Sequence, residues 1–355
     1  MRQRCPLPTA LWDAPHLHCA IVERWGLPWV EGYGMTEANL IPGVQLDYAD
    51  KGLTQRSSPV REERIMRFEF DEIGRWTEPT SFEVTAEHVK AYAAAINDTD
   101  PQHLRAALAP PLFAVVPAMR AGATRAADRI ALSDASGYDL RKVHGEQDMF
   151  FLKPIIPKMV LYSRAAPIGV DVRSSGTTIT AKSETHDQRD EMVNYQYWTV
   201  FYRGVYAPMN AGKPAPPRPM APPERRRDPV AVRVYSVDRD QPVRYAAASG
   251  DRGPYHLDES AAKAAGFPGV ILHGLCTMAF ASRALIETVC GGDSTRLRRF
   301  GLRFTHPAFP GRDLTTSIWS IEQQPQGHVY NVEAAQGTDP SVIRLAVAEV
   351  GIDTS

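Results

Sequence analysis

The sequence has almost no net charge and no long apolar run. Its 355 residues carry 40 Lys and Arg against 41 Asp and Glu, so the formal net charge is −1. No global field therefore favours nucleic acid or a membrane surface as a partner. No uninterrupted apolar run reaches the roughly 18 residues of a membrane-spanning helix, and the N-terminus lacks the apolar core of a signal peptide. We expect a cytoplasmic protein with no membrane span.

Cysteine is also scarce. The four cysteines are Cys5, Cys19, Cys276 and Cys290. They form no CxxC pair and no metal-ligand spacing, so we expect neither a disulfide nor a zinc site. The remaining composition, 43% hydrophobic and 23% charged, is that of an ordinary globular protein, and 355 residues are enough for two domains with cores.

Two copies of one unit, offset by 153 residues, make up most of the chain. The matched pairs are Tyr92 and Tyr245, Asp98 and Asp251, Pro101 and Pro254, His103 and His256, Phe151 and Phe304, Pro154 and Pro307, Pro157 and Pro310, and Leu161 and Leu314. The same offset holds for an early and a late group of positions. A duplicated fold is therefore predicted.

Each copy reads as a short helix, a loop, an apolar helical stretch and a run of strands. The short helices are expected at 85–97 and 245–249, and the apolar stretches at 112–130 and 270–289. The expected strands are 143–153, 159–168, 176–185, 192–206, 297–305, 314–322, 328–335 and 342–350. One buried helix and an antiparallel meander per copy define an α+β fold.

Composition divides the chain into four segments. These are an N-terminal segment, 1–60, a first copy, 61–206, a proline-rich linker, 207–229, and a second copy, 230–355. Proline at this density holds an extended conformation, so we expect the linker to span the outside of the pair without entering either sheet. Each central helix buries one face in its own sheet, so the two sheets are expected to join edge to edge.

The loop after each short helix carries a carboxylate and an imidazole. Asp251 and His256 stand five positions apart among glycines and a proline, so they cannot share a helix face and the loop must place them. In the first copy the equivalent candidates are Asp98, Asp100 and His103. The alternative is that such residues only cap turns and face solvent.

Four short stretches of the second half carry a family resemblance. They are GDRGPYH at 250–256, VILHG at 270–274, RF at 303–304 and PAFPG at 307–311. Together they resemble the MaoC-like (hydratase 2) family. The resemblance implies a hot dog fold, a long helix wrapped by a curved antiparallel sheet, here in tandem. It also implies that the chain adds water to acyl thioesters or removes it.

That chemistry assigns roles to the loop. Hydrating a 2-enoyl thioester requires a base, an acid and donors for the charge that develops on the thioester oxygen. We expect Asp251 and His256 to hold one water between them and the Gly274 N–H to be the oxyanion donor. The family has an Asn that orients this water at the position of Gly253, and an aliphatic residue at that of Tyr255. Both departures fall inside the expected substrate site.

Other residues are expected to contact substrate. Gly269 leaves the backbone open to a thioester carbonyl, and His273 either bonds within the core or faces the site. Arg303 clusters with Arg296, Arg298 and Arg299. The cluster either pairs with coenzyme A phosphates or is a solvated strand face. In the first copy, APPLF at 109–113 resembles the acyl-binding N-terminal half of double hot dog proteins.

The first segment has a different resemblance. Residues 1–46, above all GYGMTE at 32–37, resemble an interior segment of adenylate-forming acyl-CoA synthetases. Nothing later in the chain supplies their phosphate-binding loop or their C-terminal catalytic lysine domain. We therefore expect no ligase activity. The segment is then left from a gene fusion or from a misassigned start codon, with a lid over the acyl site as the alternative.

The sequence thus predicts a hydro-lyase, an enoyl-CoA hydratase or 3-hydroxyacyl thioester dehydratase. Its expected partner is an acyl-CoA or an acyl-carrier thioester, and coenzyme A enters only as part of the substrate, with no metal and no redox cofactor. A homodimer is compatible with this interpretation, although no residue specifies it. Two alternatives stay open: a hot dog thioesterase, whose carboxylate directs water at the carbonyl, and a non-catalytic acyl-thioester-binding protein.

Overall fold

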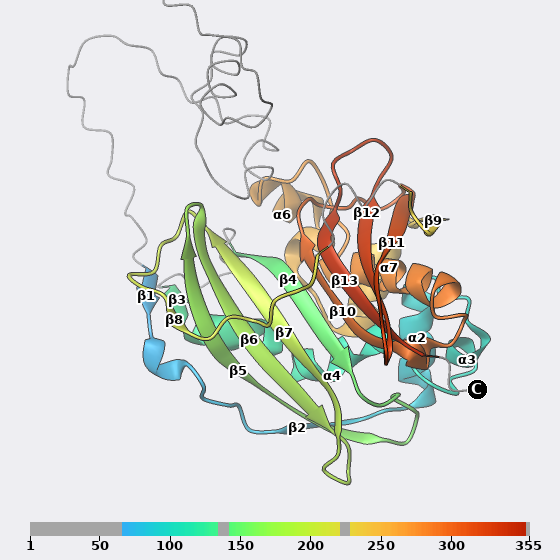
Figure 1. Cartoon of the computed structure of the whole chain (residues 1–355). Helices are drawn as coiled ribbons and strands as arrows, with labels where there is room; N and C mark the ends of the chain where they lie inside the picture. The colour runs from blue at the N-terminus through green and yellow to red at the C-terminus, as the bar shows by residue number, and fades with distance from the viewer. Residues whose placement is uncertain (1–65, 134–141, 221–227, 353–355) are drawn as a thin grey trace, which may run out of the picture. The chain divides into compact units, whose positions relative to one another are not determined.

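One continuous antiparallel sheet runs through both copies of the repeat. The computed structural model describes residues 66–133, 142–220 and 228–352 (Figure 1). In sheet order the strands are β2 (Thr80–Glu83), β5 (Val160–Arg173), β6 (Gly176–His186), β7 (Met192–Arg203), β4 (Lys142–Phe151), β10 (Leu297–Phe304), β13 (Ile343–Gly351), β12 (Gly327–Ala335), β11 (Leu314–Gln324) and β9 (Ala231–Tyr235). All eight expected strands are present, with bounds shifted by a few residues.

The two halves join edge to edge, as predicted, through β4 and β10. Their antiparallel register places Asp148 opposite Gly301. Across this seam the guanidinium of Arg299 donates two hydrogen bonds, of 3.0 and 2.8 Å, to the buried Asp148 carboxylate. Nearer one end of the two strands, Arg303 donates to Glu146. Ion pairs of complementary strands therefore reinforce the backbone ladder.

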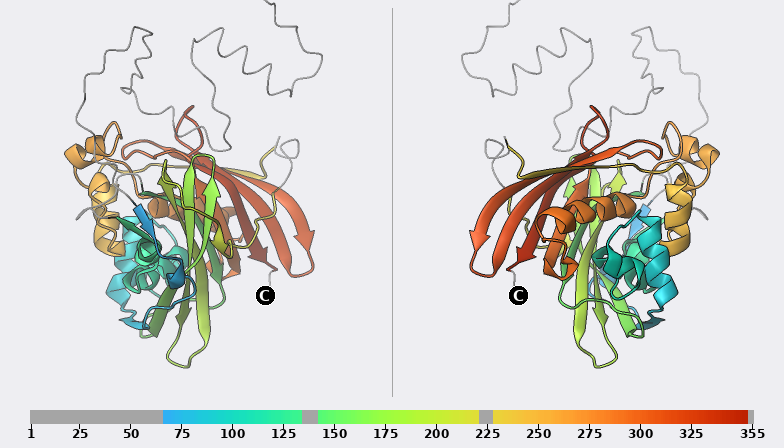
Figure 2. Two further views of the ribbon diagram at one scale, coloured as in Figure 1. Left: turned by 90° about the vertical axis from the view of Figure 1, so that its left-hand side faces the viewer. Right: turned by 90° about the vertical axis from the view of Figure 1, so that its right-hand side faces the viewer.

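The central helix of the second copy is α7 (Gly274–Thr288), whose residues from Leu275 to Ile286 are all buried. It packs against β9, β10, β11 and β13. The views in Figure 2 show the helices gathered on one face of the sheet. A helix that is surrounded by the sheet and by neighbouring helices needs no polar face, which agrees with the burial of α7 on all sides.

The first copy departs from the predicted single helical stretch over 112–130. The path is broken into η2 (Pro111–Ala114), α4 (Val115–Arg120) and η3 (Ala123–Arg129). Gly122 adopts a left-handed conformation, with φ of 88°, directly after α4. A glycine in this conformation ends a helix. The apolar composition of 112–130 predicted one continuous helix, but Gly122 limits its length.

The two short helices meet across the pair. The first is α2 (Ala86–Ala95), where Thr85 and His88 form a reciprocal capping box, and the second is α5 (Gln241–Ser249). They pack together, and the hydroxyls of Tyr92 and Tyr245 lie 3.4 Å apart in the core. The buried face of α2 therefore contacts the other copy.

The remaining elements are short. They are β1 (Met66–Phe68) paired with β3 (Ala131–Ser133), η1 (Phe70–Glu72), α3 (Pro101–Leu104), η5 (Pro254–His256), α6 (Glu259–Ala264) and η6 (Ser294–Arg296). Within the described part of the chain, no helix is long and apolar enough to cross a membrane.

The proline-rich linker enters the sheet at one point, so that prediction was wrong. Its residues Ala211–Gly212 form β8 and pair with Gly169 and Val170 of β5. This pair lies between Pro208 and Pro214, so its own residues keep the N–H groups that a ladder needs. Beyond it the linker crosses the sheet (Figure 1), where Arg218 pairs with Glu146 at the seam.

The segment 1–60, with its synthetase-like residues 1–46, lies outside the described residues. The four segment boundaries stay predictions.

Candidate active site

The second-copy loop is released by a helix stop. Gly250 adopts a left-handed conformation, with φ of 85°, and ends α5 as expected. The backbone N–H of Asp251 then donates to Ser249 Oγ, and Asp251 Oδ1 accepts the Gly253 N–H at 3.1 Å. Hydrogen bonds within the loop therefore fix the Asp251 carboxylate. The loop then continues into η5, whose last residue is His256.

The His256 ring is buried and oriented by the backbone. Its Nδ1 donates to the carbonyl of Ile271 at 2.9 Å, which leaves the Nε2 lone pair free. Burial lowers the pKa of His256 below its usual value, although the negative charge of Asp251 opposes this shift. Tyr255 packs edge-on against the ring, with centroids 4.4 Å apart. A neutral imidazole with one available acceptor is the result.

His273 belongs to the same cluster. Its ring stacks on that of His256 at 3.8 Å, and its Nε2 donates to the Asp251 carbonyl at 3.1 Å. Its Nδ1 is buried without a hydrogen-bond partner. Burial and the neighbouring His256 lower the pKa of His273 to about 3. The sequence left the role of this residue open, and the structure shows that it both bonds within the core and borders Asp251 and His256.

The three side chains also have the composition of a metal site. One ligand atom each of Asp251, His256 and His273 lies within 4.8 Å of the other two. An imidazole binds a metal in its ring plane at about 2.0–2.1 Å. Two rings stacked with an interplanar angle of 21° point their lone pairs along nearly parallel planes, not at one point. The geometry therefore fits a bound water better than a metal ion.

Gly274 is the first residue of α7, and its N–H has no acceptor within the helix. A Cβ at this position would lie 3.1 Å from the ring of Phe304, so the glycine lets that ring close on the helix start. At Gly269, by contrast, a Cβ would meet nothing within 4 Å. The approach of a thioester carbonyl that the sequence predicts at both glycines stays a prediction.

The first half contributes a residue that the sequence did not reveal. His144 of β4 packs against Phe304, with centroids 5.1 Å apart, and stacks on Trp198. Burial lowers the pKa of His144 to about 4, against the attraction of the Asp251 charge. No local pattern marks His144, because only the pairing of β4 with β10 brings it to the second-copy site.

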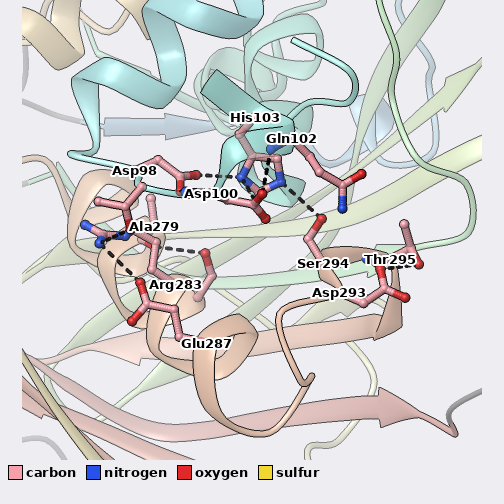
Figure 3. A network of polar contacts seen from close by, with 12 residues as sticks. Asp98, Asp100, Gln102, His103, Ala279, Arg283, Glu287, Asp293, Ser294 and Thr295 are labelled. Atoms are coloured by element: carbon pink, nitrogen blue, oxygen red, sulfur yellow. Dashed lines mark hydrogen bonds and ion pairs between the residues drawn. The ribbon is translucent and has the colours of Figure 1, made fainter. Parts of the chain in front are cut away.

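In the first copy the carboxylate and imidazole contact each other directly. Asp98 Oδ2 lies 2.7 Å from His103 Nδ1, and His103 Nε2 lies 3.1 Å from Ser294 Oγ (Figure 3). Asp100 Oδ1 instead accepts the Gln102 N–H and caps α3. The predicted candidates are thus brought together, but with a partner from the second half that the sequence did not indicate.

The arginine cluster divides between different contacts. Arg299 is buried on Asp148, and Arg303 is paired with Glu146. Arg296 donates to the backbone carbonyls of Cys290 and Gly351. Because the guanidiniums of Arg299 and Arg303 already hold carboxylates, these two residues reinforce the seam.

Comparisons with known proteins identify the family. Residues 219–340 match the family model described as the MaoC like domain. These residues belong to the MaoC-like family. Residues 71–196 match the model of the FAS1-like dehydratase domain region.

This chain also resembles solved structures. The crystal structure of a MaoC-like dehydratase from Phytophthora capsici has a TM-score of 0.67 and 24% identity, and the match covers 81% of this chain and 100% of that one. A Mycobacterium tuberculosis protein described as a double hot dog has a TM-score of 0.51 and 15% identity, covering 80% and 97%. At these identities the likeness establishes the fold, a double hot dog.

Among curated proteins, the peroxisomal enoyl-CoA hydratase 2 of Arabidopsis thaliana is 31% identical to this chain over 184 residues. This match covers 50% of the chain and 59% of the relative. The chain therefore spans less than two thirds of this relative's length.

Proposed function

We propose that this MaoC-like chain adds water to 2-enoyl thioesters, or removes it from 3-hydroxyacyl thioesters. The observation that carries the proposal is the convergence of Asp251 and His256 beside the start of α7, within 4.8 Å of each other and of His273. The similarity to an enoyl-CoA hydratase 2 supports it.

The geometry suggests how the reaction runs. A water lies between the Asp251 carboxylate and His256 Nε2, and its oxygen attacks Cβ of the enoyl thioester. The pair accepts one proton from the water and returns one to Cα, so that H and OH are both added. Negative charge develops on the thioester oxygen during attack, and the Gly274 N–H donates to it. The neutral His256 is suited to accept a proton.

Gly253 alters the water site of the proposed enzyme. A Cβ at this position would lie 3.0 Å from Cδ2 of His256 and 3.5 Å from Asp251 Oδ1. An Asn, as the family has, would therefore require the imidazole to move. In this chain the Gly253 N–H instead donates to Asp251. We infer that the loop orients the carboxylate through its backbone and that turnover is lower than in family members with the amide.

The substrate is proposed to be an acyl-CoA or acyl-carrier thioester, with the acyl chain held by the first half near residues 109–113. The proposed reaction uses no metal and no redox cofactor, since Asp251, His256 and a backbone N–H supply every proton and donor that hydration needs. A cytoplasmic location and a homodimer remain predictions.

A single assay separates the hydratase from the two alternatives. The protein is incubated with crotonyl-CoA while the enoyl absorbance and the release of free thiol are followed together. A hydratase lowers the absorbance without releasing thiol, and a thioesterase releases thiol. A binding protein does neither but retains crotonyl-CoA in equilibrium dialysis. Thiol release matching the absorbance change would overturn the proposal.

A further inference from the structure

Asp98, His103 and Ser294 form a connected relay that the proposed hydration does not use. The carboxylate lies 2.7 Å from Nδ1 of the imidazole, and Nε2 of the same ring lies 3.1 Å from the hydroxyl (Figure 3). His103 is fully buried and Ser294 is 4% exposed. Ser294 comes from the second half of the chain, so the relay is not a local turn of one loop.

An ionised carboxylate only accepts, so His103 Nδ1 carries the hydrogen that Asp98 holds. In the tautomer with its hydrogen on Nδ1, the Nε2 lone pair accepts the hydroxyl hydrogen of Ser294. The other oxygen of Asp98 accepts the Asp100 N–H at 2.9 Å, which holds the carboxylate in place. This is the arrangement in which an imidazole activates a serine.

The second-copy loop does not share this arrangement. There His256 Nδ1 donates to the Ile271 carbonyl, and Asp251 accepts a backbone N–H from Gly253. Two copies of one loop have therefore acquired different hydrogen-bond partners. In the first copy the acidic group orients the imidazole, and a hydroxyl occupies the far side of the ring.

Space lies on both sides of the relay. A hollow of about 360 Å³ is lined by Asp98 and His103 and by Arg283 and Glu287 of α7. A smaller pocket of about 40 Å³ is lined by Ser294 together with Ala109 and Pro110. A water needs about 10–15 Å³ of such volume. The smaller pocket therefore holds a group the size of an acetyl beside the serine.

We propose that Asp98, His103 and Ser294 form a second active site, which hydrolyses short-chain acyl esters or thioesters. Ser294 Oγ attacks the carbonyl carbon while His103 Nε2 takes its proton. The alcohol or thiol leaves with that proton, and an acyl-serine remains. Water then attacks the acyl-serine, His103 again transfers the proton, and the carboxylic acid is released with the serine restored. Water is the sole co-reactant.

A donor for the carbonyl oxygen is available on the same loop. Gln102 precedes His103, and Figure 3 shows its side chain extending in the direction of Ser294. We assign its carboxamide as the donor that stabilises the negative charge of the tetrahedral intermediate. Truncation in a Gln102→Ala variant should slow acylation by about tenfold or more.

The test uses p-nitrophenyl acetate and the full-length protein. The expected result is a burst of p-nitrophenolate with acetylation of Ser294, located by peptide mass spectrometry. Ser294→Ala, which deletes one oxygen, should abolish both. Asp98→Asn should slow the burst by at least about 100-fold. Thr295→Val is the matched control, because it removes the neighbouring hydroxyl, which bonds to Asp293, and should leave the acetylation intact.

Two further measurements separate this site from the proposed hydratase. Asp98→Asn should slow the burst yet keep most of the crotonyl-CoA hydration, and Ser294→Ala should unfold at the wild-type urea concentration. If wild-type protein carries no acetyl group on Ser294, or if Ser294→Ala releases p-nitrophenolate at the wild-type rate, the relay is structural and the proposal is wrong. Neither result would bear on hydration by the second copy.

Discussion

Asp148 of β4 lies directly opposite Gly301 of β10, and the two are separated by the 153 residues of the repeat. Equivalent positions of the two copies therefore face each other at the seam. Tyr92 and Tyr245, separated by the same interval, touch through their hydroxyls. These pairs mark the approximate twofold axis that relates the halves. A duplicated chain has thus formed within itself the contact that two separate copies would form as a dimer.

The buried ion pair at this axis should be essential for stability. Replacing Asp148 by Ala leaves the Arg299 guanidinium buried without its main partner, since both hydrogen bonds are lost. The expected loss in free energy of unfolding is about 3–5 kcal/mol, measured by urea denaturation. Glu259→Ala removes an exposed pair with Lys263 and should cost less than about 1 kcal/mol. Equal losses in the two variants would contradict this account of the seam.

The two loops should differ in hydration. We expect Asp251→Asn and His256→Ala each to lower the turnover of crotonyl-CoA by at least about 100-fold, the usual scale for losing a general acid or base. Asp98→Asn should cost much less, because the first-copy loop has no Gly274 equivalent at a long helix start. A first-copy variant without activity, beside second-copy variants of nearly normal turnover, would reverse the assignment.

The close approach of Gly253 to the His256 ring should have a measurable effect on kcat. In a Gly253→Ala variant the new methyl group lies 3.0 Å from Cδ2 of His256, so the imidazole must shift by a few tenths of an ångström. We expect kcat to fall by about threefold or more, because catalysis depends on the position of the base. Gly269→Ala adds a methyl group in open space and should cost less. A larger loss at position 269 would show that the Gly253 contact is relaxed in solution.

Stability should decline in mild acid because of the half-buried His144. Burial lowers the pKa of His144 from 6.5 to about 4, so in the native state the ring stays neutral where the unfolded chain takes up a proton. The folded state therefore keeps its full stability above pH 6.5. It loses stability as the pH falls from 6.5 toward 4, because only the unfolded chain binds the proton. Between pH 7.5 and pH 5 this one group should lower the free energy of unfolding by about 2 kcal/mol.

Urea denaturation of a His144→Gln variant at both pH values isolates this contribution. The difference in stability between pH 7.5 and pH 5 should be smaller than in the wild type by that amount, whatever the variant loses at pH 7.5. An unchanged difference would mean that His144 is solvated in the folded protein.

The N-terminal segment should be dispensable for hydration. Deleting residues 1–60 removes the synthetase-like stretch and none of the candidate catalytic side chains, so turnover of crotonyl-CoA should stay within a few-fold of the full-length rate. The intact protein should form no acyl-adenylate. ATP-dependent pyrophosphate exchange with a fatty acid measures this directly, and detectable exchange would refute the prediction.

The sequence by itself determined the local features of this protein. Apolar runs, several of them alternating with period two, placed the eight predicted strands, because a half-buried strand needs that pattern wherever it lies. Gly250 marked the end of α5, since its left-handed conformation suits glycine. The spacing of Asp251 and His256 marked the loop, because two groups five positions apart meet only when a turn brings them together.

Only the tertiary structure decided which residues from the two halves meet. Ser294 reaches His103 across 191 residues, and Arg299 reaches Asp148 across 151. His144 packs beside the second-copy site because β4 pairs with β10 in one register. A register is the sum of many backbone and side-chain contacts, and a shift of one residue would turn these side chains to the opposite face. No local sequence pattern specifies all of these contacts. The residues that the opposite half contributes could therefore be identified only from the tertiary structure.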